Sequence, residues 1–213
     1  MGTQERLGTR ERLGTQERLV RSTQELLWER GYVGTSPKAI LERAGVGQGS
    51  MYHHFSGKAD LALAAIRRTA EEMQQTAEEC LGGPGTAYDR VAAYLLRERQ
   101  VLRGCPIGRM TQDRDVVHSP ELRAPLDEMF GWLRGRIAEV LTEGRRRGEL
   151  AAELDPVATA ATVAAVVQGG YVLARAADAT APFDAAVQGV LALLAAQATP
   201  PVPPASPVPP ASA

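Results

Sequence analysis

The stretch GYVGTSPKAILERAGVGQGSMYHHFSGKADL, residues 31–61, decides the fold of the N-terminal part of this 213-residue chain. It predicts two short helices joined by a tight glycine turn, followed by the start of a longer helix. Ser36 and Pro37 are typical of a helix start, because a hydroxyl can cap free amides and proline is preorganised for the first turn. Gly45 is placed to take the left-handed conformation that ends the first short helix. This layout is that of a helix-turn-helix, a DNA-reading motif.

The second short helix has an apolar side and a polar side. Met51 and Phe55 are four residues apart, so they share the face that we expect to pack inward. The remaining positions carry groups suited to base edges and phosphates, namely Gln48, Gly49, Ser50, Tyr52, His53 and His54. Gln48 can bond adenine in bidentate fashion, which is worth roughly 1–3 kcal/mol of base discrimination. Tyr52 and His54 can donate to phosphate oxygens, which fix the register of a protein on DNA rather than its sequence preference.

Lys58 stands in the first turn of the third helix, which Ser56 is expected to cap. A cation at this position opposes the helix macrodipole. A bound phosphate would resolve that conflict, because free amides and a lysine would then both face an anion. We therefore expect Lys58 to contact the DNA backbone.

Residues 15–66 resemble, without a gap, the DNA-binding domain of the TetR/AcrR family of bacterial repressors. The matching positions are Gly31-Tyr32, Thr35-Ser36, Ile40, Ala44-Gly45-Val46, Met51-Tyr52, His54-Phe55, Lys58 and Leu61. The resemblance implies phosphate contacts by Thr35, Tyr52, His54 and Lys58. It implies a base-facing set made of Gln48, Gly49, Ser50 and His53. Gly47 departs from the pattern, since relatives often have a capping Ser there.

Composition favours an all-α chain with two unlike modules. Hydrophobic residues make up 44% and aromatic residues only 5%, so the core is built mostly on Ala, Leu and Val, which favours helix over sheet. Residues 1–70 hold 11 Lys/Arg and 7 Asp/Glu, a net charge of +4. The remainder holds 13 and 18, a net charge of −5. A basic part beside an acidic part fits a DNA reader attached to a different module.

The two ends of the chain are repetitive. GTQERL, GTRERL and GTQERL follow one another over residues 2–19, and a period of six cannot place leucines on one helix face. Arg6, Arg10 and Arg12 could touch DNA as a basic arm, although a duplicated arm without a role is the favoured interpretation. The Pro-rich sequence at 199–213 predicts an extended, unpacked tail, with a ligand for a proline-recognising domain as the lesser alternative.

These features predict an all-α fold with four segments. The predicted domains are a disordered repeat arm (1–14), a three-helix helix-turn-helix DNA-binding domain (15–62), a helical ligand-binding and dimerisation domain (63–197) and a disordered Pro-rich tail (198–213). From residue 58 to residue 197 the sequence predicts helices at 58–81, 86–102, 120–148, 156–177 and 182–197, with an irregular or short helical piece at 104–119.

The last two predicted helices are apolar over more than one face, so they must be buried on most sides. Residues 156–174 carry no charge, but their many alanines favour burial between subunits over a membrane span. Pairing with a second copy would make a four-helix interface in a two-fold homodimer, and the family resemblance implies the same. The two DNA-reading helices would then lie roughly 34–36 Å apart, which predicts a palindromic operator.

The C-terminal part resembles the LmrA/YxaF-like branch of the family. The resemblance lies in GCPIG at 104–108, PELR at 120–123, Phe130, Trp132 and QGGYVLAR at 168–175. It implies a small hydrophobic effector that is drug-like or flavonoid-like. The candidate lining residues are Tyr94, Met110, Phe130, Trp132, Gln168 and Tyr171, each of which could instead be ordinary core. An effector that prefers the form with wrongly spaced DNA helices would release DNA, with a coupling free energy of roughly 1–3 kcal/mol.

Other classes of protein fit less well. Cys80 and Cys105 make neither a disulfide framework nor a metal site, and we expect no cofactor. Cys105 and His118 are the only loose catalytic candidates, so we do not expect an enzyme. The N-terminus has no apolar signal region, which favours a cytoplasmic protein without a membrane partner. Two alternatives stay open, namely a redox-responsive regulator that uses the two cysteines and an architectural DNA-binding protein without an effector.

Overall fold

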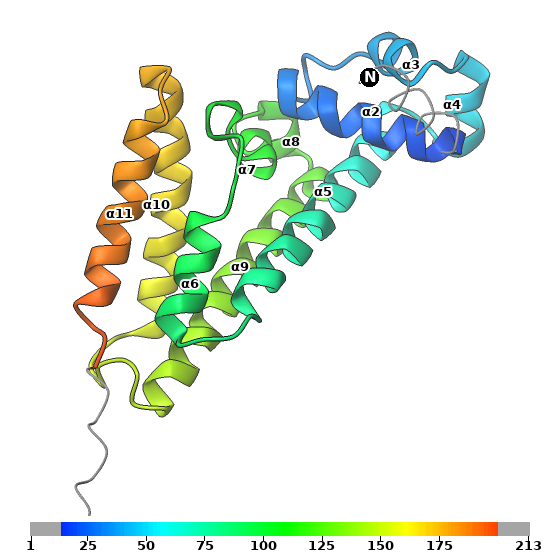
Figure 1. Cartoon of the computed structure of the whole chain (residues 1–213). Coiled ribbons are helices and arrows are strands. Elements are labelled where there is room, and N and C mark those ends of the chain that lie inside the picture. Colours follow the sequence, from blue (N-terminus) through cyan, green and yellow to red (C-terminus); the bar gives the residue numbers. More distant parts are fainter. Residues whose placement is uncertain (1–13, 200–213) are drawn as a thin grey trace, which may run out of the picture.

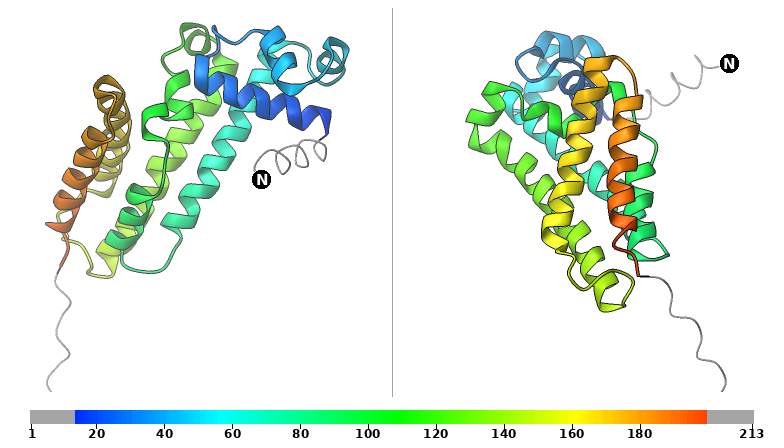
Figure 2. Two further views of the ribbon diagram at one scale, coloured as in Figure 1. Left: turned by 45° about the horizontal axis from the view of Figure 1, so that its top comes forward. Right: turned by 90° about the vertical axis from the view of Figure 1, so that its left-hand side faces the viewer.

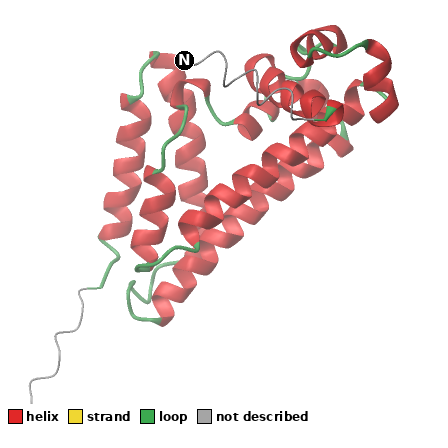
Figure 3. Ribbon diagram, turned by 45° about the vertical axis from the view of Figure 1, so that its right-hand side comes forward, coloured by secondary structure: helices red, strands yellow, loops and turns green. Residues whose placement is uncertain are grey.

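The computed structural model describes residues 14–199, and all regular structure in that range is helical (Figure 3). The all-α prediction is therefore confirmed for this part of the chain. The sole β pairing there is a single bridge between Leu150 and Ala198. Apart from Gly14, the predicted repeat arm lies outside the described residues, and so does the Pro-rich sequence beyond Thr199.

The N-terminal unit is a helix-turn-helix set on the start of a long helix. It consists of α2 (Thr15–Arg30), α3 (Pro37–Ala44), α4 (Gln48–His54) and the first turns of α5 (Lys58–Leu81). The Ser36 hydroxyl accepts a hydrogen bond from the Ala39 amide at 3.2 Å, and Gly45 has φ 64° and ψ 42°. Both local signals in the sequence are thus confirmed.

The predicted cap of α5 is wrong. Gly57 occupies the capping position, and no side chain caps this helix. Ser56 instead turns both its backbone amide and its hydroxyl toward the Asp60 carboxylate, at 2.9 and 3.2 Å. The Asp60 carboxylate in the first turn of α5 therefore accepts hydrogen bonds from Ser56, and the Ser56 hydroxyl caps no amide of the helix.

The C-terminal unit packs around α5. Its elements are α6 (Ala87–Leu96), η1 (Val101–Arg103), α7 (Pro106–Met110), α8 (Arg114–His118), α9 (Pro120–Arg146), α10 (Pro156–Ala177) and α11 (Ala181–Ala195). In Figure 1, α5 and α9 lie side by side along the long axis, α10 packs on α9, and α11 packs on α10. The helix-turn-helix sits at one end of α5, where α2 crosses it.

Helix α6 is shorter than the predicted 86–102, because its last turn is capped by arginines. Thr86 and Asp89 start the helix with a reciprocal capping box. At the other end the Tyr94 carbonyl accepts from Arg99 at 2.6 Å and from Arg97 at 3.3 Å. Arg97 itself leaves helical geometry with ψ 149°. Side-chain donors therefore take the place of the amides that would have continued the helix.

The last two described residues, Ala198 and Thr199, lie beside the turn between α9 and α10. The Ala151 amide donates to the Gln197 carbonyl at 2.8 Å, and the Thr199 amide donates to the Glu149 carbonyl at 2.9 Å. Residues 198 and 199, assigned above to the disordered tail, are thus fixed to the turn between α9 and α10.

Helices α10 and α11 leave an apolar face uncovered. One side of α10 is buried, including Ala160, Val163, Val167 and Ala174, while Val157, Val172, Leu173 and Leu193 of the pair are exposed. The right-hand view of Figure 2 looks onto this pair, and no other helix lies in front of it. Helix α10 is long and apolar enough to cross a membrane, but a single helix with these properties is weak evidence, since core helices of soluble proteins share them.

Arg90 joins the end of α5 to α9. Its side chain is only 10% exposed. It donates to the Leu81 carbonyl at 2.6 Å, where α5 ends without a basic residue in its last turn, and to Glu143 at 2.7 Å. One guanidinium thus satisfies a free helix carbonyl and holds α9 against the α5–α6 turn.

Replacing Arg90 with Ala should lower the free energy of unfolding by about 1–3 kcal/mol, because it leaves the Leu81 carbonyl and Glu143 without this donor. Arg147→Ala is the matched control, since Arg147 pairs with the same Glu143 but is half exposed, and such pairs contribute about 1 kcal/mol or less. Urea denaturation would measure both. Equal losses in the two variants would contradict the role given to Arg90.

Candidate nucleic-acid interface and internal cavities

Helix α4 presents a polar face because its apolar residues anchor it to the core. Met51 is fully buried and Phe55 is 6% exposed. Away from these two residues the helix is exposed at Gln48, Gly49, Tyr52, His53 and His54. Ser50 is half-buried. The structure thus brings the predicted base-facing set and two of the predicted phosphate contacts onto one surface.

Thr35 differs from the other predicted contacts. Its side chain is 1% exposed, and its hydroxyl donates to the Gly31 carbonyl at 2.6 Å. The hydroxyl therefore closes the turn between α2 and α3. A direct phosphate contact by this group would require that hydrogen bond to break.

Lys58 is held toward the junction of the two units. Its ammonium lies 4.0 Å from the centroid of the Tyr32 ring, a cation–π contact. Burial lowers the pKa of Lys58, and the nearby carboxylates of Asp113 and Asp115 oppose that shift. Lys58 thus lies near both the predicted DNA surface and the carboxylates of Asp113 and Asp115. A DNA phosphate would compete with these carboxylates for the Lys58 ammonium.

The segment from η1 to α8 is bonded directly to the helix-turn-helix. The Trp28 indole donates to the Gly104 carbonyl at 3.0 Å, and Arg109 donates to the Glu29 carbonyl at 3.1 Å. The Val33 amide donates to the Asp113 carboxylate at 2.9 Å. These contacts could not be predicted from the sequence, because nothing local in either segment signals that the other lies against it.

Arg103 adds a charged contact to this junction. Its guanidinium lies 3.6 Å from the Trp28 ring centroid and forms ion pairs with Glu25 and Glu29. Glu29 also receives two hydrogen bonds from Arg43 of α3, each at 2.8 Å. The Arg43 guanidinium therefore holds the pKa of Glu29 below its usual range. These contacts tie η1, α2 and α3 into one network.

A cavity of about 760 Å³ lies behind the same segment. Its walls come from α7, α9 and α10, and its lining residues are Gly104, Cys105, Gly108, Arg109, Thr111, Gln112, Phe130, Arg134, Ala161, Ala164, Ala165, Gln168, Tyr171, Val172, Arg175 and Ala176. We call it the α10 cavity. Three of the predicted lining residues are present, namely Phe130, Gln168 and Tyr171.

The other three predicted lining residues are absent from this cavity. Tyr94 and Met110 are buried in the core at 3% and 1% exposure, and Trp132 packs against the core from its edge. For these three positions core packing, rather than cavity lining, is observed. The arginines and alanines of the lining were missed, because neither residue type stands out in an Ala- and Arg-rich sequence.

A second cavity, of about 820 Å³, adjoins the first. Gly104, Cys105 and Tyr171 line both cavities. The remaining lining of the second comes from α2, α5 and the residues after α6: Arg21, Gln24, Glu25, Trp28, Thr69, Glu72, Met73, Thr76, Arg97, Glu98, Arg99, Gln100 and Pro106. We call it the α2 cavity. The segment around Gly104 thus borders both cavities and also contacts the helix-turn-helix.

The two cysteines differ in their surroundings. Cys105 is buried, and its Sγ accepts from the Gly108 amide at 3.2 Å. Burial raises the pKa of this thiol. Cys80 is half-buried on α5. No group of three or more His, Cys, Asp or Glu suited to a metal ion occurs between residues 14 and 199.

Comparison with known proteins identifies the family. Residues 19–65 match the sequence profile of the bacterial regulatory proteins of the tetR family, and residues 86–190 match that of the tetracyclin repressor-like C-terminal domain. The chain belongs to the TetR family. It is thus a DNA-binding transcription regulator rather than an enzyme.

Individual relatives agree with this assignment. The transcriptional regulator AcuR of Cereibacter sphaeroides is 30% identical over 67% of this chain and 68% of its own length. LmrA of Bacillus subtilis is 24% identical over 78% of this chain and 88% of its own, and YxaF is also similar, which confirms the resemblance to that branch. A TetR regulator from Chloroflexus aurantiacus is 28% identical, with a TM-score of 0.79 over 86% of this chain and 96% of that one.

Replacing Gln48 with Ala should weaken binding to a selected operator by about 1–3 kcal/mol and relax the base preference at one position of each half-site. Gln48 is exposed, so the fold should be unaffected. Gln75→Ala, an exposed glutamine on α5 away from this surface, is the matched control. Gel-shift titrations against the operator and single-base variants would measure the effect. An unchanged base preference would remove Gln48 from the base-facing set.

Proposed function

We propose that this protein is a cytoplasmic repressor that binds a palindromic operator as a homodimer and is released by a small-molecule effector. The observation that carries the proposal is the position of the segment from η1 to α8. One side of it bonds to α2 through Trp28, Arg109 and Glu29, and the other side lines the α10 cavity. A ligand in that cavity would therefore act on residues that touch the DNA-reading unit.

The homodimer is supported by the uncovered face of α10 and α11. Val157, Val172 and Leu173 are 56–72% exposed on α10, and Leu193 is 68% exposed on α11. Two such faces placed against each other would bury these side chains in a four-helix interface. A two-fold axis there would set two α4 helices on one face of DNA, which requires an operator of matching symmetry.

Release by an effector would follow from coupled equilibria. The contacts of Gly104 and Arg109 with α2 fix the helix-turn-helix relative to the cavity wall. A ligand that binds better to a form with a shifted wall must weaken DNA binding by the same coupling free energy, typically about 1–3 kcal/mol. Helix α5 would transmit the same shift, because its first turns pack under α2 and its last turns pack against α9.

Relatives support a repressor that acts on operator DNA. One similar structure is the TetR family regulator CifR in complex with 26-base-pair operator DNA, with a TM-score of 0.71 over 84% of this chain. The NemR protein of Escherichia coli, named a transcriptional repressor, is 24% identical over 84% of this chain. The proposed repression, rather than activation, follows the name of NemR.

The redox alternative is disfavoured by the surroundings of Cys105. The thiolate is the reactive form of cysteine, and burial raises the pKa of this thiol. The architectural alternative is disfavoured by the two cavities, which a protein without an effector does not need.

Selection from a randomised duplex library, by repeated gel shift at fixed moderate salt, tests the proposal directly. We expect a palindromic consensus with half-sites about one helical turn apart. Enrichment of no sequence, with binding that fades uniformly as salt rises, would instead indicate the architectural alternative.

Leu173→Glu should convert the dimer to monomer and weaken operator binding, because a carboxylate would be buried at the proposed interface. Leu96→Glu is the matched control, since Leu96 is as exposed as Leu173 but lies at the end of α6. Sedimentation velocity would give the oligomeric state of each variant. A dimeric Leu173→Glu protein with normal operator affinity would place the interface elsewhere.

Replacing Cys80 and Cys105 together with Ser should leave operator binding and its release by the effector unchanged. The same gel shifts, repeated after treatment with hydrogen peroxide, would compare the variant with the native chain. Loss of release in the variant, or a peroxide response that disappears with the cysteines, would favour the redox alternative.

A further inference from the structure

Five arginines around the two cavities form no ion pair within residues 14–199. They are Arg97, Arg99, Arg109, Arg134 and Arg175. Several other arginines of the C-terminal unit are paired, namely Arg90, Arg103, Arg136 and Arg147. The α10 cavity takes three arginines into its lining and no Asp or Glu at all. Its lining therefore carries positive charge without a carboxylate beside it.

The acidic residues of the α2 cavity do not neutralise this charge. Glu25 pairs with Arg103, and Glu72 accepts from Gln24 at 3.0 Å. Glu98 is exposed. None of the three forms an ion pair with Arg97 or Arg99.

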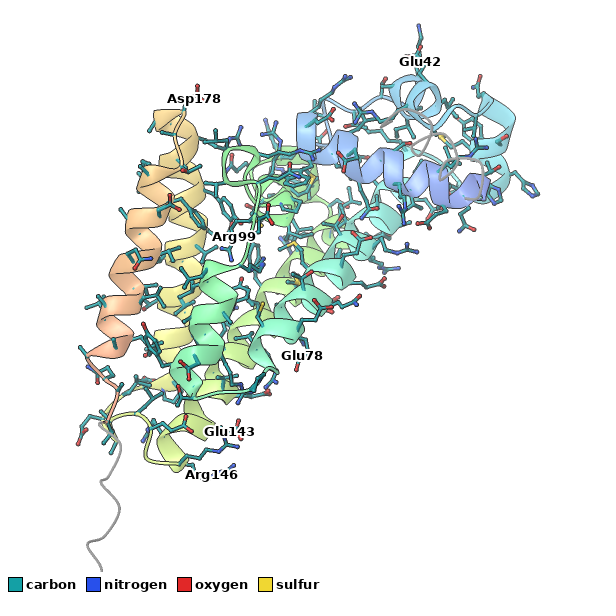
Figure 4. All side chains as sticks on the ribbon, in the orientation of Figure 1. Glu42, Glu78, Arg99, Glu143, Arg146 and Asp178 are labelled. Carbon is teal, nitrogen blue, oxygen red and sulfur yellow. The ribbon has the colours of Figure 1, made fainter. Side chains whose placement is uncertain are left out.

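Arg99 is the most constrained of the five arginines. Figure 4 shows it between α10 and the end of α6. One nitrogen of its guanidinium donates to the Tyr94 carbonyl, while Nε and Nη1 are buried without any hydrogen-bond partner. Its carbon Cζ lies 5.3 Å from the Phe183 ring centroid. Buried charged donors without acceptors are rare, because they lose hydration without replacing it.

Nothing in the protein supplies the missing negative charge. Burial, and then the neighbouring Arg97, lowers the pKa of Arg99. Tyr171 lies beside it, but burial raises the pKa of that phenol, so Tyr171 stays neutral near pH 7. Nε and Nη1 point in different directions from the guanidinium, and Nη2 is bound to the Tyr94 carbonyl, so each free nitrogen can donate a separate charge-assisted hydrogen bond to an anionic oxygen.

A second unpartnered donor lies on the other side of Cys105. Arg109 uses one nitrogen for the Glu29 carbonyl, and its Nε is buried without a partner. The apolar part of the α10 cavity lining consists of Phe130, Ala161, Ala164, Ala165 and Val172. The lining thus combines an apolar surface with the positive charge of three arginines.

We propose that the effector is an organic anion, a carboxylate on an apolar body. The carboxylate is bound by Arg99 beside Tyr171 in the α2 cavity, and the apolar body extends past Tyr171 toward Phe130 and the alanines of α10. The proposal rests on the proposed function, because it names the ligand class of that same effector site. It narrows the hydrophobic effector expected from the sequence to one with a negative charge.

The test uses matched pairs of probes on the full chain. Benzoate, phenylpropanoate and decanoate are each compared with the primary amide of the same skeleton, by thermal shift and by release of the selected operator. At least one carboxylate should raise the Tm and release DNA, and its amide should do neither. Equal effects of acid and amide, or no effect of any carboxylate, would overturn the proposal.

Arg99→Met should weaken carboxylate binding by roughly tenfold to a hundredfold, because the charged hydrogen bonds are lost. Operator binding without ligand should be unchanged. The Tm of the free variant should not fall, since the substitution removes an unpaired buried charge and Arg97 still donates to the Tyr94 carbonyl. A lower Tm with unchanged carboxylate affinity would show a structural role instead.

Two further variants complete the test. Arg67→Met changes an exposed arginine of α5 that lines neither cavity, and it should respond as the native chain does. Arg99→Lys keeps the charge but replaces the separate donor nitrogens of the guanidinium with a single ammonium, so it should retain part of the affinity. Failure of the native chain to bind any operator would count against the proposed function, whereas thermal shifts with the probes would still report on the anion site.

Discussion

Helix α5 lies in the hydrophobic core that both units share, and the arrangement of both units depends on it. Leu61, Ala65 and Ile66 are buried under α2, while Ala77 and Leu81 are buried further along the same helix, where it packs on α6 and α9. Close-packed interiors transmit displacements rather than absorbing them. A rotation of α5 against α9 would thus move α2, and α4 with it. The two units cannot change their packing independently.

The contacts of Trp28, Glu29 and Val33 with the segment after α6 give this arrangement a second connection. Backbone carbonyls accept two of those bonds and a backbone amide donates the third. One partner in each bond is a main-chain group that the local fold fixes, so movement of either segment changes all three bonds. The cavity wall and the DNA-reading unit are therefore coupled at two places, one along α5 and one through Gly104 and Arg109.

Sequence alone predicted what local signals encode. Three signals each lie within about one turn of helix: Ser36-Pro37, Gly45, and the spacing of Met51 and Phe55. The structure agrees with the prediction from each of them. Predictions that depended on tertiary surroundings failed. Ser56 lost its capping role to Asp60, and α6 ended early because two arginines beyond it reach back to Tyr94.

The cavity was the least predictable feature for the same reason. Tyr94 and Met110 are residue types that often line binding sites. Here α6 and α7 pack so that both side chains point into the hydrophobic core. Arg99 and Arg109 carry the unusual electrostatics of the site, yet an arginine in sequence does not reveal whether it has an acceptor. Only the three-dimensional contacts show that Arg99 and Arg109 have buried nitrogens without an acceptor.

The bridge between residues 149–151 and 197–199 has a practical consequence for handling the protein. It holds Ala198 and Thr199 beside the turn that follows α9, at the pole of the molecule opposite α4 (Figure 1). A surface attachment made at Thr199 would start from that pole. On a sensor chip it would therefore leave α4 facing the solution.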